Sequence, residues 1–139
     1  MNRADKIKAC RPHIILKESK KTNDEEQFQN EVLRPILKFQ NELLIKLFLS
    51  NCKTYKINFT EFNSEEKSDY IENIFKKDFK IRTSFIGTVI ALFTLEEFEK
   101  YSVNQKFYNK RIIQMLIERL KDQTTLSNLS TQVLYEKIS

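Results

Sequence analysis

The chain of 139 residues contains a single glycine, Gly87, and two prolines, Pro12 and Pro35. Sharp turns, bulges and phosphate-binding loops depend on residues that tolerate a positive φ or preset φ. A chain with so few of them has no glycine-rich loop and few sharp turns. We therefore expect helices throughout.

Metal-binding and redox residues are also scarce. His13 is the only histidine, and Cys10 and Cys52 are the only cysteines. One histidine makes no three-ligand zinc site unless carboxylates or cysteines join it, and no local spacing supports that. We expect no metal, no cofactor and no disulfide framework. A thiol enzyme with His13 as base for Cys10 or Cys52 is one alternative; a cysteine packed as a small hydrophobe is the favoured one.

Long hydrophobic runs are absent too. The longest nearly apolar run covers residues 85–93, far short of the roughly 20 residues that span a bilayer. The first residues lack the apolar stretch of a signal peptide. We expect a cytoplasmic protein with reduced thiols and no membrane partner.

The positive charge is concentrated at the start of the chain. Residues 1–21 carry seven Lys or Arg against two Asp or Glu, while residues 22–139 carry 17 of each sign, so the net +5 belongs to this arm. The arm is either a solvated leader helix or an electrostatic tether for nucleic acid or an acidic partner. The cations that would bind nucleic acid are Arg3, Lys6, Lys8, Arg11, Lys17, Lys20 and Lys21.

Helix-start residues are abundant in the remainder. Capping boxes pair Thr22 with Glu25 or Asn23 with Glu26, and further ones begin at Asn63 and Thr94. We expect a long central helix from residue 24 to about 53, kinked near Pro35, and then a loop over residues 51–62 that Tyr55 and Phe59 hold to the surface.

Further helices are expected over residues 64–93, as one bent helix or as two, and over about 95–101 and 104–122. In the short helix, Leu95, Phe98 and Tyr101 share one side. Gly87 lies inside the most apolar segment, where it would permit close approach of another helix or ring. We predict an all-α fold, an irregular bundle of about five to six helices. The predicted organisation is an arm (1–21), a helical domain (22–123) and a tail (124–139) that is either a short docked helix or disordered.

Four polar residues lie on or near apolar helix faces: Gln40, Arg82, Asn109 and Arg34. Buried amide and guanidinium groups require partners. If these residues converge, they form a structural hydrogen-bond network or a small pocket for an anion, since Arg binds carboxylate and phosphate bidentately. In the favoured alternative, Arg82 reaches solvent or pairs with Glu72 or Asp78.

Three stretches, EEQFQNEVLRPILKFQNELLI (residues 25–45), SFIGTVIALFTLEEFEKY (84–101) and NKRIIQMLIERLKDQ (109–123), carry a resemblance. The chain resembles a group of short bacterial all-helical proteins of unassigned function, some of which carry the label "glyoxalase". The resemblance covers most of residues 25–123 and implies an all-helical fold. It assigns no site residue to this chain.

The expected function is a non-enzymatic one, in which the helical domain binds a protein partner or a second copy of itself. The first alternative is a nucleic-acid-associated protein that uses the basic arm. The second is a small-ligand binder, or an enzyme of the glyoxalase-labelled group, with Arg82, Asn109 and Gln40 in its pocket.

Overall fold

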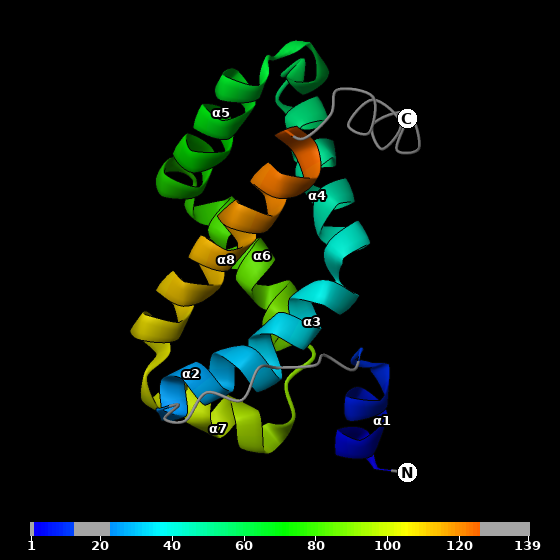
Figure 1. Cartoon of the computed structure of the whole chain (residues 1–139), viewed down its shortest axis with the longest axis vertical. Coiled ribbons are helices and arrows are strands. Elements are labelled where there is room, and N and C mark those ends of the chain that lie inside the picture. Colours follow the sequence, from blue (N-terminus) through cyan, green and yellow to red (C-terminus); the bar gives the residue numbers. More distant parts are fainter. Residues whose placement is uncertain (1, 13–22, 126–139) are drawn as a thin grey trace. The chain divides into compact units, whose positions relative to one another are not determined.

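The structure, a computed structural model, describes residues 2–12 and 23–125, and within these ranges it is helical with no β-strand (Figure 1). The predicted all-α fold is confirmed. The helical segments are more numerous than the five or six expected, because the long central helix and the 64–93 segment are both interrupted.

The chain divides into two compact units, each built from stretches that are distant in sequence. Unit 1 comprises Met1–Asn41 and Ile86–Ile112, and unit 2 comprises Glu42–Phe85 and Ile113–Ser139. Helices α6 (Phe79–Ile90) and α8 (Gln105–Thr125) pass from one unit into the other. The predicted tail from residue 126 onward lies outside the described residues, while α8 runs through Thr125.

Unit 1 contains α1 (Arg3–Cys10), α2 (Asp24–Phe28), α3 (Arg34–Phe39) and α7 (Leu95–Val103), together with the end of α6 and the start of α8. Its core is aromatic. The Phe28 ring lies 5.6 Å from that of Phe93 and 4.7 Å from that of Tyr108. Tyr101, on α7, is 2 % exposed and packs against Phe93.

Near Pro35, where the sequence predicts a kink, the structure has one wide helical turn. Residues Gln29–Leu33 form a π-helical turn, in which the Arg34 N–H bonds to the Gln29 carbonyl. A proline ring clashes with the carbonyl four residues earlier and donates no hydrogen bond. The widened turn accommodates that misfit. A second break at Gln40 (φ −86°, ψ 1°) precedes α4 (Asn41–Thr54).

Unit 2 contains α4, a 3₁₀ turn (Phe59–Glu61), α5 (Ser64–Lys77), the first part of α6 and the second part of α8. Phe48, Phe59, Phe75 and Phe85 are almost fully buried in its core. The loop predicted over residues 51–62 is therefore partly wrong. Helix α4 continues to Thr54, and Tyr55 is 55 % exposed instead of holding the segment to the surface, whereas Phe59 is buried as expected.

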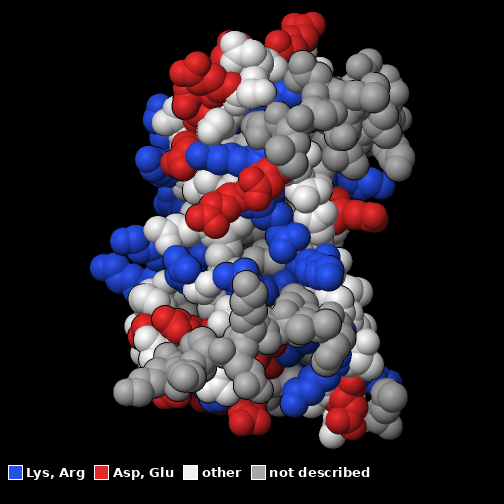
Figure 2. Space-filling view, in the orientation of Figure 1, with Lys and Arg blue, Asp and Glu red and all other residues white. Residues whose placement is uncertain are grey.

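The predicted helix starts at Asn63 and Thr94 are confirmed as complete capping boxes, with Glu66 and Glu97 as their partners. Helix α5 also has its acidic residues in the first turn and Lys76 and Lys77 in the last, as the helix dipole favours. Figure 2 shows acidic side chains at the top of the view, where α5 begins. Asp78 separates α5 from α6, so residues 64–93 contain two helices.

Gly87 does not serve a close approach. It is exposed on α6, and a Cβ added to it would meet nothing within 4 Å. The expectation that another helix or ring packs on this glycine is wrong, because the apolar residues around it bury the opposite sides of the helix.

Candidate functional site

Three of the four residues predicted to line a polar pocket lie in unit 1, and each has its own partner. The Arg34 Nε donates to Asn30 Oδ1 (2.9 Å), and the Gln40 Nε2 donates to the Thr88 carbonyl (3.1 Å). Asn109 Oδ1 accepts from the Tyr101 hydroxyl. Each of these three side chains therefore has a hydrogen-bond partner of its own, and the partners differ.

Arg82 belongs to unit 2, where its Nη1 donates to the carbonyls of Phe75 (3.1 Å) and Lys76 (2.6 Å). Those carbonyls lie in the last turn of α5 and have no partner within the helix. Arg82 therefore caps α5. The pairing expected with Glu72 or Asp78 is replaced by this cap, and a pocket shared by all four residues stays a prediction.

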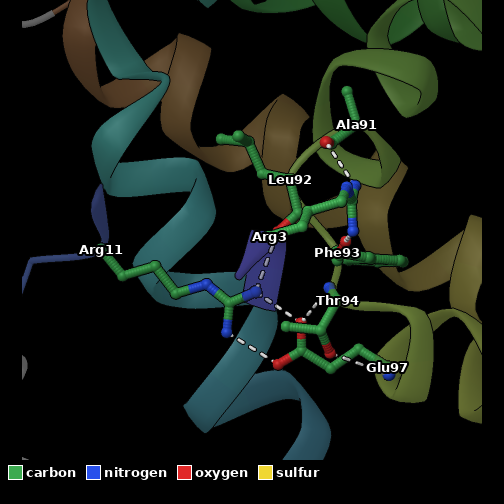
Figure 3. A network of polar contacts seen from close by, with 7 residues as sticks. All are labelled: Arg3, Arg11, Ala91, Leu92, Phe93, Thr94 and Glu97. Carbon is green, nitrogen blue, oxygen red and sulfur yellow. Dashed lines mark hydrogen bonds and ion pairs between the residues drawn. The ribbon is translucent and has the colours of Figure 1, made fainter. Parts of the chain in front are cut away.

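The basic arm supplies a contact that the sequence did not indicate (Figure 3). In unit 1, Arg11 Nη1 donates to Glu97 Oε2 (2.7 Å), and Nη2 donates to Glu97 Oε1 and to the Leu92 carbonyl (2.9 Å). Arg3 Nη1 donates to the Phe93 carbonyl at 2.8 Å. The segment between α6 and α7 thus binds both arginines of the arm through its carbonyls and the Glu97 carboxylate.

This network is largely withdrawn from water. The side chains of Arg11 and Glu97 are only 10 % and 13 % exposed. Burial by itself would raise the pKa of the Glu97 carboxyl, but hydrogen bonds from Arg11 and from the Thr94 N–H lower that pKa below its ordinary value of 4.5. Glu97 therefore stays ionised and holds Arg11 as a bidentate partner.

Two of the seven cations proposed to bind nucleic acid are consequently engaged within the protein. Arg3 and Arg11 contact residues 91–97, whereas Lys6 and Lys8 are exposed. Lys17, Lys20 and Lys21 lie outside the described residues, as does His13. The arm's first helix is thus a docked part of unit 1 and not a solvated leader.

The two cysteines differ in environment. Cys10 is exposed on α1 and Cys52 is buried in α4. Burial raises the pKa of the Cys52 thiol to about 12 even though Tyr70 hydrogen-bonds to it. The Cys52 thiol is therefore protonated at neutral pH, which is the behaviour of a packing residue.

Helix α7 exposes an apolar face, a second feature that sequence reasoning missed. Leu95 is 75 % exposed, Val103 87 % and Phe98 42 %, and Phe107 at the start of α8 is 38 % exposed. The expected side with Leu95, Phe98 and Tyr101 together is partly correct: the Phe98 ring lies 5.8 Å from that of the buried Tyr101, but Leu95 is exposed. The capping box predicts where α7 begins, but it does not indicate which side of the helix packs against the rest of unit 1.

Unit 2 has a cavity of about 310 Å³ between the C-terminal half of α4 and the start of α6. Leu47, Ile81 and Phe85 form its apolar wall. Its polar lining consists of Ser50, Asn51, Thr54, Tyr55, Asp78, Lys80 and Ser84. Asp78 Oδ1 already accepts from the N–H groups of Lys80 (2.9 Å) and Ile81 (3.2 Å), so it caps α6.

Two features set this cavity apart from an ordinary surface hollow. Asn51 Oδ1 is buried without a hydrogen-bond partner, a rare and costly state for a polar atom. Lys56, directly after Tyr55, adopts φ 57°, in the left-handed region that disfavours every residue with a Cβ.

Within residues 2–12 and 23–125, no group of three or more His, Cys, Asp or Glu side chains is placed to hold a metal ion. None of the helices in the same ranges has the length and apolarity that a bilayer crossing requires. In the comparisons with known proteins, no family model, no curated protein and no solved structure matches this chain.

Proposed function

We propose that this chain is a protein-interaction module, and that its partner through α7 is a second copy of itself. The observation that carries the proposal is the exposed apolar face of α7. The two free cysteines support a reducing, cytoplasmic location.

The apolar side chains of α7 have the spacing of a contact stripe. Phe98 follows Leu95 by three residues and Val103 follows it by eight, so the three spread over about 140° of one side of the helix, with the exposed Glu99 and Ser102 between them. Single exposed apolar residues are common on any protein surface, whereas a contiguous group marks an interaction site. Helix α7 faces inward through Tyr101 and the Glu97 network, and the half-exposed Phe98 ring lies 5.8 Å from that of Tyr101.

The charges around this stripe favour a second copy as the partner. Glu96 lies in the first turn of α7 and Glu99 at its middle, whereas Lys100 lies in the last turn and Lys106 at the start of α8. All four are exposed. Antiparallel pairing of two α7 helices places each acidic half against a basic half, while parallel pairing opposes like charges. A two-fold dimer uses the same patch on both copies, as this arrangement requires.

The contact is small. Helix α7 has 9 residues, and stable specific interfaces bury about 1,200 Å² or more in total. We therefore expect a reversible dimer whose population depends on protein concentration.

Charge reversal tests the pairing by light scattering over a range of concentrations. The variants Glu96→Lys/Glu99→Lys and Lys100→Glu/Lys106→Glu should each be monomeric, because each has a patch of one sign. A mixture of the two should form heterodimers, and the variant with all four charges reversed should dimerise like the wild type. A wild type that stays monomeric at high concentration would overturn the proposal.

The apolar stripe is tested by Val103→Asp, which should abolish the dimer because it buries a carboxylate against Leu95 and Phe98. Leu43→Asp is the matched control. Leu43 is 50 % exposed on α4 of unit 2, and its replacement should leave the dimer intact. Equal loss in both variants would argue against the α7 face.

A further inference from the structure

We propose that the unit 2 cavity between α4 and α6 binds single-stranded nucleic acid, with one base against Tyr55 and the phosphates held by the surrounding lysines. This inference is independent of the α7 dimer, since every residue it uses belongs to unit 2.

The aromatic platform is Tyr55. This side chain lines the cavity and is 55 % exposed, although a tyrosine ring in a helical bundle ordinarily packs. Exposed rings offer a π-face on which any base stacks, and stacking of this kind tolerates every sequence. Phe79, next to the cavity residues Asp78 and Lys80, is a second exposed ring. The Arg82 guanidinium lies 5.8 Å from the Phe79 ring centroid.

The cavity has the size and lining of a site for one base. Its volume of about 310 Å³ lies at the lower end of the range for small-molecule sites. Leu47, Ile81 and Phe85 provide an apolar wall, and the serine and threonine hydroxyls provide donors and acceptors. Asn51 adds its side-chain amide to this polar lining, and its Oδ1 atom is itself buried.

Lysines without an ion pair lie next to the lining residues in the sequence, and one of them, Lys80, lines the cavity itself. Lys53 and Lys56 flank the lining residues Thr54 and Tyr55, and Lys77 and Lys80 flank Asp78 and Phe79. All four are exposed, and the structure gives none of them an ion pair within the described residues. The single carboxylate in the cavity, Asp78, is engaged in capping α6. The net local charge is therefore positive.

The backbone at Lys56 strengthens the assignment. The Ile57 N–H bonds to the Cys52 carbonyl (2.9 Å) and the Lys56 N–H to the Lys53 carbonyl (3.1 Å), which together end α4 in a Schellman motif. Glycine is the ordinary residue at this left-handed position, and lysine is strained there. A lysine at a strained position, beside an exposed ring and a polar cavity, is expected where its positive charge contributes to ligand binding.

A strand explains these features better than a free nucleotide does. The cavity accommodates only one base, and Lys80 alone of the four lysines lines it. Lys53 lies in α4, Lys56 follows the end of α4, and Lys77 is the last residue of α5. Successive phosphates of a strand occupy such a set of cations, whereas the phosphate of one nucleotide needs fewer.

The test measures fluorescence anisotropy of a labelled oligothymidylate of about ten nucleotides, with the full chain, over a series of salt concentrations. The wild type should bind at low salt, and log K should fall with log salt with a slope of about −0.7 per phosphate contacted. Tyr55→Ala should weaken binding about tenfold, and Tyr55→Phe should bind like the wild type because it keeps the ring. Lys56→Gly should weaken binding and reduce the salt slope.

The control variant is Lys6→Gln/Lys8→Gln, which removes two exposed cations of α1 and should leave the affinity within about twofold, since neither residue belongs to the unit that carries the proposed site. Three outcomes would overturn the proposal: no binding at low salt, equal binding by wild type and Tyr55→Ala, or a loss confined to the α1 variant. If thymidine monophosphate displaces the labelled oligomer as well as the unlabelled oligomer does at the same nucleotide concentration, the ligand is not a strand.

Discussion

Lys56 has a backbone conformation that its side chain makes unfavourable. With φ 57°, it is the only described residue other than glycine at positive φ. The position after the last turn of α4 needs a left-handed residue so that the Cys52 and Lys53 carbonyls are satisfied. The chain accepts the strain of a lysine there.

Lys56→Gly should therefore raise the free energy of unfolding, by about 1 kcal/mol, because glycine adopts this conformation without strain. Urea denaturation followed by circular dichroism measures the change. Lys53→Gly, at a helical position one turn earlier, is the control and should destabilise by a similar amount. If both glycines destabilise equally, the left-handed strain at Lys56 is not significant.

At the scale of elements, the attachment of α1 depends on one carboxylate. Glu97 satisfies the capping box of α7 and also receives Arg11 from α1. A glutamine at this position keeps the cap, because it still accepts from the Thr94 N–H, but it loses the charge that Arg11 binds.

Glu97→Gln should lower the free energy of unfolding at neutral pH by about 1 to 2 kcal/mol. The pKa of Glu97 is lowered in the folded state, so its stabilisation is complete above pH 4.5 and is lost as the pH falls through the lowered value. The difference between the wild type and Glu97→Gln should therefore narrow in acid. Denaturation at several pH values measures it.

Glu66→Gln is the matched control for that experiment. Glu66 completes the capping box of α5 and has no ion pair in the described part of the chain. Its replacement keeps the cap and removes no ion pair, so it should change stability little at neutral pH. A Glu97→Gln difference that does not vary with pH would contradict the assigned role of the charge.

The sequence predicts these elements better than it predicts their packing. The starts at Asn63 and Thr94 follow from residues three positions apart, and the irregular turn before Pro35 follows from the chemistry of one ring. The Arg11–Glu97 pair joins residues 86 positions apart, and no local pattern indicates it. The inward side of α7 is likewise chosen by Tyr101 and Glu97 through contacts with distant segments.

At the scale of the whole molecule, the candidate sites divide between the units. The α7 face and the Arg11–Glu97 network belong to unit 1, and the cavity with Tyr55 and Lys56 belongs to unit 2. The net charge of +5 therefore describes neither site. The balanced total over residues 22–139 concealed a local group of lysines near Tyr55 and Phe79.

If the chain dimerises through α7, its melting temperature should rise with protein concentration, because association stabilises the folded state by mass action. For a chain of this size, each 1 kcal/mol of added stability raises the melting temperature by about 4 °C. A hundredfold increase in protein concentration can stabilise the folded state by about 2.7 kcal/mol at most. Differential scanning calorimetry over that concentration range measures the shift in melting temperature. Glu96→Lys/Glu99→Lys should melt at one temperature throughout, and a wild type that does the same would argue against the dimer.

The contrast between Cys10 and Cys52 has a practical consequence. Cys10 stands exposed at the end of α1, while Cys52 is buried and its pKa of about 12 keeps the thiol unreactive. A maleimide dye added to the native protein should thus attach at a single place, without any mutation. The label would report directly on whether the first helix stays on its unit.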